Sequence, residues 1–209
     1  MSRTPFPRLK TGLVAILRGL TFDEVEPVVG GLIEAGFEAI EIPLNSPDPF
    51  RSIERAVRLA PDGVLIGAGT VLQPAQVDRL AEVGGRLLVS PNIDPAVMER
   101  ASAHGMVTMP GVMTPTEAFT ALACGASALK FFPASLLGPA GIKAVRAVLP
   151  KDAVVGAVGG VGPAEFASYA AVGVSVFGLG SNLYAPGMDA EEVNRRGSEA
   201  VAAYRALDI

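Results

Sequence analysis

The stretch GASALKFFP at residues 125–133 contains the pattern that decides the fold. Its glycine can stop a preceding helix in a left-handed turn, an apolar run of strand length follows, and Pro133 closes the run. Runs that are apolar on both faces are typical of parallel strands covered by helices. Such runs recur at near-even spacing, and they predict strands over residues 13–17, 38–44, 64–69, 86–90, 106–110, 127–133, 153–160 and 174–180.

Segments with helical periodicity lie between these runs, for example residues 74–84, 95–105 and 114–125. They open near proline, threonine or aspartate and end on glycine, as helices commonly do. Eight alternating units predict an α/β fold, a (β/α)8 TIM barrel that forms a single domain over residues 1–209. An open doubly wound sheet is the alternative, but the G-x-G-x-x-G fingerprint after the first strand is absent.

Composition limits the classes of function. The formal net charge of -4 offers no general attraction to nucleic acid or to an acidic membrane. Cys124 is the one cysteine and His104 the one histidine, so we expect no disulfide framework and no metal site. The apolar run at 13–17 is interrupted by Arg18 before it reaches signal-peptide length, and no run approaches the ~20 residues of a membrane span. We expect a cytoplasmic protein.

Polar and glycine residues follow the predicted strands, where the chemistry of a parallel barrel gathers at one mouth. The residues that we expect at this mouth are Arg18, Glu41, Gly69, Thr70, Pro91, Lys130, Val158, Gly159, Gly160, Gly180 and Ser181. Thr70 has a second interpretation, as the N-cap of the next helix.

Lys130 and Glu41 each interrupt an apolar strand, and together they can carry a reaction. Burial and a nearby cation such as Arg18 would lower the pKa of the lysine, and a neutral amine can attack a carbonyl group to give an imine. Glu41 could then relay protons. The alternative interpretation is a buried structural ion pair between the second and sixth strands.

Two glycine-rich segments predict a phosphate site. In VGGVGP (158–163) and GLGSNL (178–183), bare glycines let backbone N–H groups approach an anion. Each segment is expected to lie just before a helix start, in the loops after strands seven and eight, where barrels commonly bind phosphate. Ordinary turns also use glycine pairs, which is the alternative.

Several motifs resemble one enzyme family along essentially the whole chain, in order. They are VAILRG (14–19), EAIEIPLNSP (38–47), IGAGTVL (66–72), SPN (90–92), ALKFFPAS (128–135), AVGGV (157–161) and GLGSNLY (178–184). They are similar to the class I aldolases that cleave 2-keto-3-deoxy-6-phospho sugar acids. The resemblance implies a homotrimeric barrel without a metal or other cofactor, which forms a covalent lysine imine with its substrate and releases pyruvate and glyceraldehyde 3-phosphate.

Carried over by position, the resemblance makes Lys130 the imine-forming lysine and Glu41 the proton shuttle. It implies that the carboxylate end of the substrate is held by Arg18 and by Thr70 with the backbone of Gly69. The residues implied to hold the phosphate are Gly159, Gly160, Gly180 and Ser181.

Two departures from the gluconate-type members resemble the galactonate-type branch, which acts on the C4 epimer. Asn45 stands where an arginine is usual, and Val158 stands where a threonine is usual. Loss of a hydroxyl donor removes a partner for one orientation of the C4 hydroxyl group. The alternatives are a gluconate-type aldolase, a sugar-phosphate isomerase that uses Glu41 as a base, and a non-catalytic phosphate-ligand binder.

Overall fold

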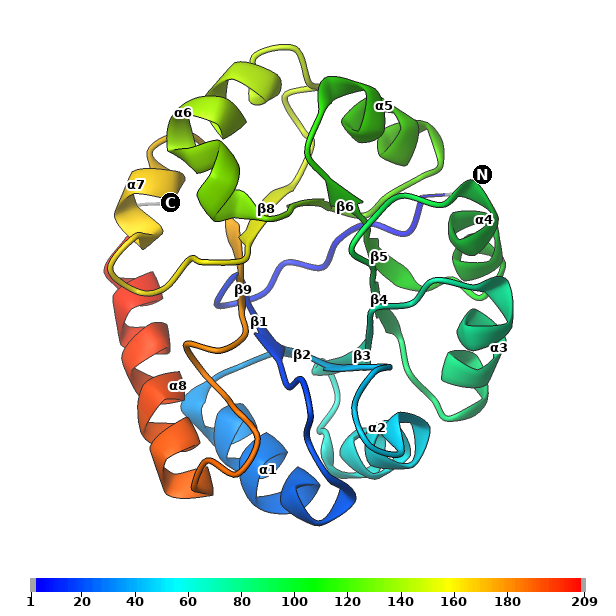
Figure 1. Ribbon diagram of the computed structural model, residues 1–209, viewed down its shortest axis with the longest axis vertical. Coiled ribbons are helices and arrows are strands. Elements are labelled where there is room, and N and C mark those ends of the chain that lie inside the picture. Colours follow the sequence, from blue (N-terminus) through cyan, green and yellow to red (C-terminus); the bar gives the residue numbers. More distant parts are fainter. Residues whose placement is uncertain (1–2, 208–209) are drawn as a thin grey trace.

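The computed structural model describes residues 3–207, and its strands form one parallel sheet that is surrounded by helices (Figure 1). The strands are β1 (Leu13–Ile16), β2 (Ala39–Pro43), β3 (Leu65–Gly69), β4 (Leu87–Val89), β5 (Val107–Met109), β6 (Gly111–Val112), β7 (Leu129–Phe131), β8 (Val155–Val158) and β9 (Val176–Leu179). The helices are η1 (Phe22–Glu24), α1 (Val25–Ala35), α2 (Pro49–Leu59), α3 (Pro74–Glu82), α4 (Pro95–Ala103), α5 (Pro115–Ala123), α6 (Ala134–Arg146), α7 (Phe166–Ala170) and α8 (Ala190–Arg205). All eight predicted strands are present.

The ring closes at Pro110, which interrupts the fifth predicted strand. β5 pairs with β4 and β6 pairs with β7, so two short strands share one position in the barrel. The amide of Ala128 donates to the carbonyl oxygen of Thr108 at 3.0 Å, which joins the remaining edges. Proline has no amide hydrogen and breaks a regular ladder. The (β/α)8 barrel is therefore confirmed, and β6 is the element that the sequence interpretation missed.

Local sequence fixes where the helices begin and end. A proline occupies the first turn of α2, α3, α4 and α5, where its missing amide hydrogen costs nothing. α5 also has a capping box, because the Thr114 hydroxyl accepts from the Glu117 amide and the Glu117 carboxylate accepts from the Thr114 amide. The glycines that end the predicted helical segments at residues 84, 105 and 125 have positive φ angles, and so do Gly36 and Gly173, which stand ahead of other strands.

Side chains alternate between the inside of the barrel and the layer beneath the helices. Leu13 and Ala15 of β1 belong to the outer core, whereas Val14 and Ile16 belong to the inner one. Ala39 on β2 and Ala128, which directly precedes β7, are inner residues. Because strand side chains have a period of two, positions 41 and 130 also face inward, one layer closer to the mouth.

The N-terminal segment crosses the barrel before β1 begins (Figure 1). Phe6 and Leu9 pack against the inner core, and the Ser127 hydroxyl donates to the carbonyl oxygen of Thr4 at 2.6 Å. The interior is therefore filled by side chains at this end, while the opposite end holds the polar residues. Across residues 3–207, none of the helices combines the length and apolar character needed to cross a membrane.

Candidate active site

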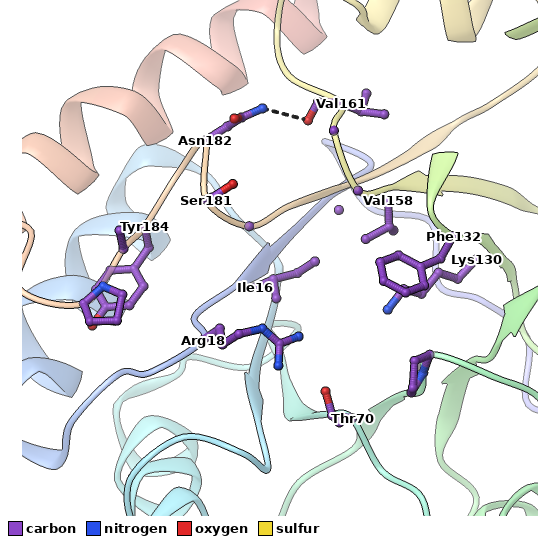
Figure 2. A pocket seen from close by; sticks show the side chains of 17 residues that line it. Ile16, Arg18, Thr70, Lys130, Phe132, Val158, Val161, Ser181, Asn182 and Tyr184 are labelled. Atoms are coloured by element: carbon purple, nitrogen blue, oxygen red, sulfur yellow. Dashed lines mark hydrogen bonds between the residues drawn. The ribbon is translucent and has the colours of Figure 1, made fainter. Parts of the chain in front are cut away.

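The carboxyl ends of the strands surround a cavity of about 310 Å³. Lys130 on β7, Arg18 after β1 and Thr70 after β3 point into it (Figure 2). Most of the residues predicted for the mouth line this cavity, namely Arg18, Thr70, Pro91, Lys130, Val158, Gly159, Gly160, Gly180 and Ser181. Glu41 and Gly69 do not line it, and both are buried.

Lys130 is the amine of this cavity. Its register partners on the neighbouring strands are Gly111 and Gly156, whose missing side chains let the Pro91 backbone and the Met109 side chain approach closely. The side chain is 6% exposed, and its ammonium nitrogen lies 4.7 Å from the centre of the Phe132 ring. Burial lowers the pKa of Lys130, against the opposing charge of Glu41 and with the help of Arg18. A fraction of the amine is therefore neutral at a lower pH than in a free lysine.

The structure differs from the ion-pair interpretation of Lys130 and Glu41. Among residues 3–207, no carboxylate oxygen lies within 4.0 Å of the Lys130 nitrogen, so Lys130 forms no salt bridge with Glu41. Their charges nevertheless affect each other's pKa. The two groups are therefore coupled by charge without forming a direct ion pair.

Glu41 is a buried carboxyl group with an unpartnered oxygen atom. It is 1% exposed, and its Oε2 atom has no hydrogen-bond partner among the described residues. Burial raises the pKa of Glu41 from 4.5 to about 7, although the charges of Lys130 and Arg18 act in the opposite direction. The group is therefore able both to accept and to release a proton near neutral pH.

Gly69 makes room for this carboxyl group. A Cβ atom on Gly69 would lie 2.1 Å from Oε2 of Glu41, closer than van der Waals contact allows. The carbonyl oxygen of Gly69 accepts from the Leu44 amide at 2.8 Å. The sequence interpretation gave the Gly69 backbone a place beside the substrate carboxylate. Gly69 is not among the residues that line the cavity, and this role stays a prediction.

Arg18 places a guanidinium group in the cavity, and a hydrogen bond to a neighbouring side chain orients it. Its guanidinium group donates to the side-chain oxygen of Asn45, which follows β2. The sequence interpretation treated Asn45 as the loss of an arginine. The structure adds that Asn45 orients the arginine that remains.

Thr70 has a strained backbone. Its φ angle is 58°, in the left-handed region that a β-branched residue rarely adopts. Such a conformation costs about 1–2 kcal/mol and is maintained mainly at functional positions. The interpretation of Thr70 as a helix N-cap is wrong, because Gln73 is the N-cap of α3. The Thr70 side chain lines the cavity instead.

We therefore expect Thr70→Gly to raise stability and lower activity. Relief of the left-handed strain should raise the free energy of unfolding by about 0.5–1 kcal/mol, after the entropy cost of glycine. Loss of the hydroxyl group, which the resemblance assigns to the substrate carboxylate, should lower kcat/KM by about tenfold to a hundredfold. Thermal unfolding and steady-state kinetics measure the two effects. Thr70→Ser is the control that keeps the hydroxyl group, and wild-type kinetics in Thr70→Gly would contradict the prediction.

The glycine pair after β8 forms one wall of the cavity. Gly159 and Gly160 have φ angles of 92° and 71°, which favour glycine. A Cβ atom on Gly160 would lie 2.7 Å from the Cβ atom of Ser135, so this loop lies tightly against the start of α6. In the described part of the chain, the amides of Gly160 and Ser181 donate to no backbone carbonyl. These free N–H groups can bind an anion.

The two loops reach their helices later than the sequence suggests. The expectation that each loop lies just before a helix start is wrong for residues 178–183, because α8 begins at Ala190, whereas α7 begins at Phe166, three residues after residues 158–163. The loops are instead joined to each other by the Asn182 side chain, which donates to the carbonyl oxygen of Val161 at 3.2 Å (Figure 2). Backbone amides, rather than helix dipoles, are the donors that this wall offers.

Sequence reasoning did not single out several residues of the cavity, including Phe132, Gly178, Asn182, Tyr184 and Pro186. A signal was available for two of them, because Phe132 and Gly178 lie two residues from Lys130 and Gly180 and therefore share their side of the strand. The other three belong to the irregular loop after β9, where no periodicity indicates the direction of a side chain. Among residues 3–207, no group of three His, Cys, Asp or Glu side chains could hold a metal ion.

A closed parallel barrel with its ionisable groups at the carboxyl ends of the strands belongs to the TIM-barrel class of enzymes. Comparison with known proteins then identifies the family. Residues 8–198 match the family described as "Aldolase: KDPG and KHG aldolase". The chain belongs to this family and is accordingly a carbon–carbon lyase.

Individual relatives cover nearly the whole chain. The "probable 2-dehydro-3-deoxy-6-phosphogalactonate aldolase" of Rhizobium meliloti (strain 1021) is 65% identical over 207 residues, which are 99% of this chain and 98% of the relative. The 2-dehydro-3-deoxy-6-phosphogalactonate aldolase of Escherichia coli (strain K12) is 52% identical over 196 residues, or 94% and 96% of the two chains. A solved structure described as "Native KDPGal structure" superposes with a TM-score of 0.93 at 52% identity, covering 95% of this chain and 96% of the other.

Proposed function

We propose that this enzyme cleaves 2-dehydro-3-deoxy-6-phosphogalactonate to pyruvate and D-glyceraldehyde 3-phosphate, through an imine on Lys130. The observation that carries the proposal is the buried amine of Lys130, which faces a cavity with anion-binding groups. The names of the relatives agree with this substrate. No metal or other cofactor enters the proposed reaction.

The substrate has an anionic group at each end, and the cavity offers a partner for each. The guanidinium group of Arg18 and the hydroxyl group of Thr70 would bind the carboxylate. The free amides of Gly160 and Ser181 would bind the phosphate, and the neighbouring Gly159 and Gly180 would complete its site. The C2 carbonyl group would then lie near Lys130.

The reaction begins with the neutral amine of Lys130. Its nitrogen attacks C2 of the substrate to give a carbinolamine, and water leaves to give the protonated imine. The Glu41 carboxylate, directly or through a water molecule, takes the proton from the C4 hydroxyl group. The C3–C4 bond breaks, its electron pair forms an enamine, and glyceraldehyde 3-phosphate leaves. Protonation of C3 and addition of water then release pyruvate and restore the amine.

The environments of the two groups suit these roles. Lys130 needs to lose its proton before it attacks, and its burial lowers its pKa. Glu41 needs to take a proton and later return one, and a pKa of about 7 allows both at neutral pH. Hydrogen bonds to the Glu41 carboxylate would lower its pKa again, and its unpartnered Oε2 atom avoids that effect.

Val158 supports the galactonate-type substrate. Its side chain lines the cavity and is opposite Gly178, where a Cβ atom would lie 2.6 Å from Cγ2 of Val158. Gly178 thus leaves space for the branched side chain. A methyl group cannot donate a hydrogen bond to the C4 hydroxyl group, so the epimer that needs such a donor there loses transition-state stabilisation.

Kinetics with the two C4 epimers test the substrate. We expect kcat/KM to favour the galactonate epimer by about tenfold or more, and Val158→Thr to lower this ratio by a similar factor. Val148→Thr, which makes the same change at a position that is 58% exposed, should keep the wild-type ratio. A wild-type preference for the gluconate epimer would instead support the gluconate-type alternative.

Two further alternatives are weaker. An isomerase would use Glu41 as a base without a covalent adduct, and a phosphate-ligand binder would leave the substrate unchanged. Membership of an aldolase family favours cleavage over both. Borohydride reduction in the presence of pyruvate distinguishes the aldolase from both alternatives, because only an enzyme that forms an imine with pyruvate is labelled irreversibly.

We also propose that the enzyme is a cytoplasmic homotrimer. The family resemblance supports this assembly, and so do apolar side chains that the single chain leaves in solvent. Leu136 is 72% exposed and Phe119 is 46% exposed. Burial of such side chains between subunits stabilises an oligomer.

A further inference from the structure

Tyr184 connects two segments of the cavity wall that are far apart in the sequence. Its ring lines the cavity, and its side chain is 2% exposed. Its hydroxyl group donates to the Glu24 carboxylate, at 3.3 Å from each of the two oxygen atoms. Tyr184 follows β9, whereas Glu24 ends the short helix that follows β1.

Glu24 also holds its own segment in place. Its carboxylate accepts from the amide of Thr21 at 2.8 Å and from the Thr21 hydroxyl group at 2.5 Å. Burial and the negative charge of Glu24 raise the pKa of the Tyr184 phenol, so the phenol keeps its proton and remains a donor at neutral pH. One carboxylate thus fixes both the segment after β1 and the segment after β9.

A second contact joins the same segments. Gly19 has a φ angle of 86°, and a Cβ atom there would lie 2.6 Å from Cγ of Pro186. The segments are therefore in direct contact beside the cavity, and Figure 2 shows Tyr184 on the same side of it as Arg18. We call residues 17–24 the carboxylate arm, because they include Arg18, and residues 180–186 the phosphate arm, because they include Ser181.

We propose that Tyr184 and Glu24 are positioning residues that fix the separation between the carboxylate arm and the phosphate arm. This inference rests on the proposed function, in which one substrate molecule binds both arms. A ligand with two charged ends binds well when its partners are already at the matching distance. A ligand with one charged end uses one arm and is indifferent to the distance.

The hydroxyl group of Tyr184 can be removed without loss of its ring. We expect Tyr184→Phe to raise KM for 2-dehydro-3-deoxy-6-phosphogalactonate by about tenfold, since a hydrogen bond to a charged group is lost, with a smaller change in kcat. The pyruvate concentration that gives half-maximal borohydride trapping should stay within about twofold of wild type, and so should the inhibition constant of inorganic phosphate. Glu24→Gln should behave in the same way.

A double variant tests whether the two residues act as one unit. If they do, Tyr184→Phe with Glu24→Gln should raise KM no further than the more severe single variant. Tyr204→Phe is the matched control, because it also removes a hydroxyl group that donates a hydrogen bond, in this case to the carbonyl oxygen of Ser175 at 3.0 Å, and because Tyr204 does not line the cavity. It should keep wild-type kinetics.

Three results would overturn the inference. They are an unchanged KM in Tyr184→Phe, an equal weakening of pyruvate, phosphate and whole substrate, and additive effects in the double variant. Failure of the proposed function would give a different result, because the wild-type enzyme itself would then neither cleave the substrate nor be trapped with pyruvate.

Discussion

Lys130→Ala abolishes cleavage and trapping, if the amine of Lys130 is the nucleophile. We expect kcat to fall by about 10⁴-fold or more, because an imine mechanism has no substitute for the missing nitrogen. Borohydride with pyruvate should add a reduced pyruvyl group to the wild-type peptide that contains Lys130, and mass spectrometry should find no such adduct in the variant. Lys143→Ala, which removes an exposed lysine from α6, should be trapped and should turn over normally.

The stability of a second variant separates chemistry from structure. Lys130→Met keeps the length and most of the volume of the side chain but removes a charge that burial disfavours. We expect its thermal midpoint to equal or exceed that of the wild type. If Lys130 were instead one half of a structural ion pair, Lys130→Met would leave Glu41 as an unpaired buried charge and would destabilise the barrel. Turnover by Lys130→Ala would refute the nucleophilic role directly.

Glu41→Gln lowers kcat by about 10²- to 10⁴-fold while the barrel stays folded, if the carboxyl group relays protons. Wild-type kcat/KM should show a limb with a pKa of about 7, and this limb should be absent from Glu41→Gln. Glu54→Gln, on the exposed face of α2, is the control and should keep the wild-type profile. An equal loss of stability and activity in Glu41→Gln would favour a structural role.

The same pKa shift predicts how stability depends on pH. In the native state Glu41 has a pKa of about 7, above its ordinary value of 4.5, so the folded protein binds more protons than the unfolded chain between these values. The contribution of Glu41 to the free energy of unfolding is therefore full below pH 4.5 and falls as the pH rises through 7. Urea unfolding at a series of pH values should show this decline in the wild type and a smaller one in Glu41→Gln.

The strands and the inward-facing pair were predictable from the sequence because they depend on local patterns. Apolar runs marked each strand, and Glu41 and Lys130 stood out because each interrupts such a run. β6 was missed because it has two residues and directly follows Pro110, where the pattern reads as a turn. A pattern of this length has no periodicity to detect.

The remaining features depend on contacts between distant segments. Asn45 reads as a lost arginine until its contact with Arg18 is seen. Tyr184 and Glu24 are 160 residues apart, and the sequence around either residue gives no sign that the two are in contact. Gly69 resembles an ordinary strand-end glycine, and its role emerges from the neighbouring strand, where the side chain of Glu41 needs the space.

The contact of Gly69 with Glu41 has a consequence for anyone who wishes to redesign this enzyme. The two positions behave as one composite site, in which the total volume rather than either residue alone is constrained. In a library that varies residue 69 alone, most side chains would displace the Glu41 carboxyl group from its position. Joint variation, with a shorter acid such as aspartate at 41 together with alanine at 69, offers a route to move the proton donor relative to the bond that breaks.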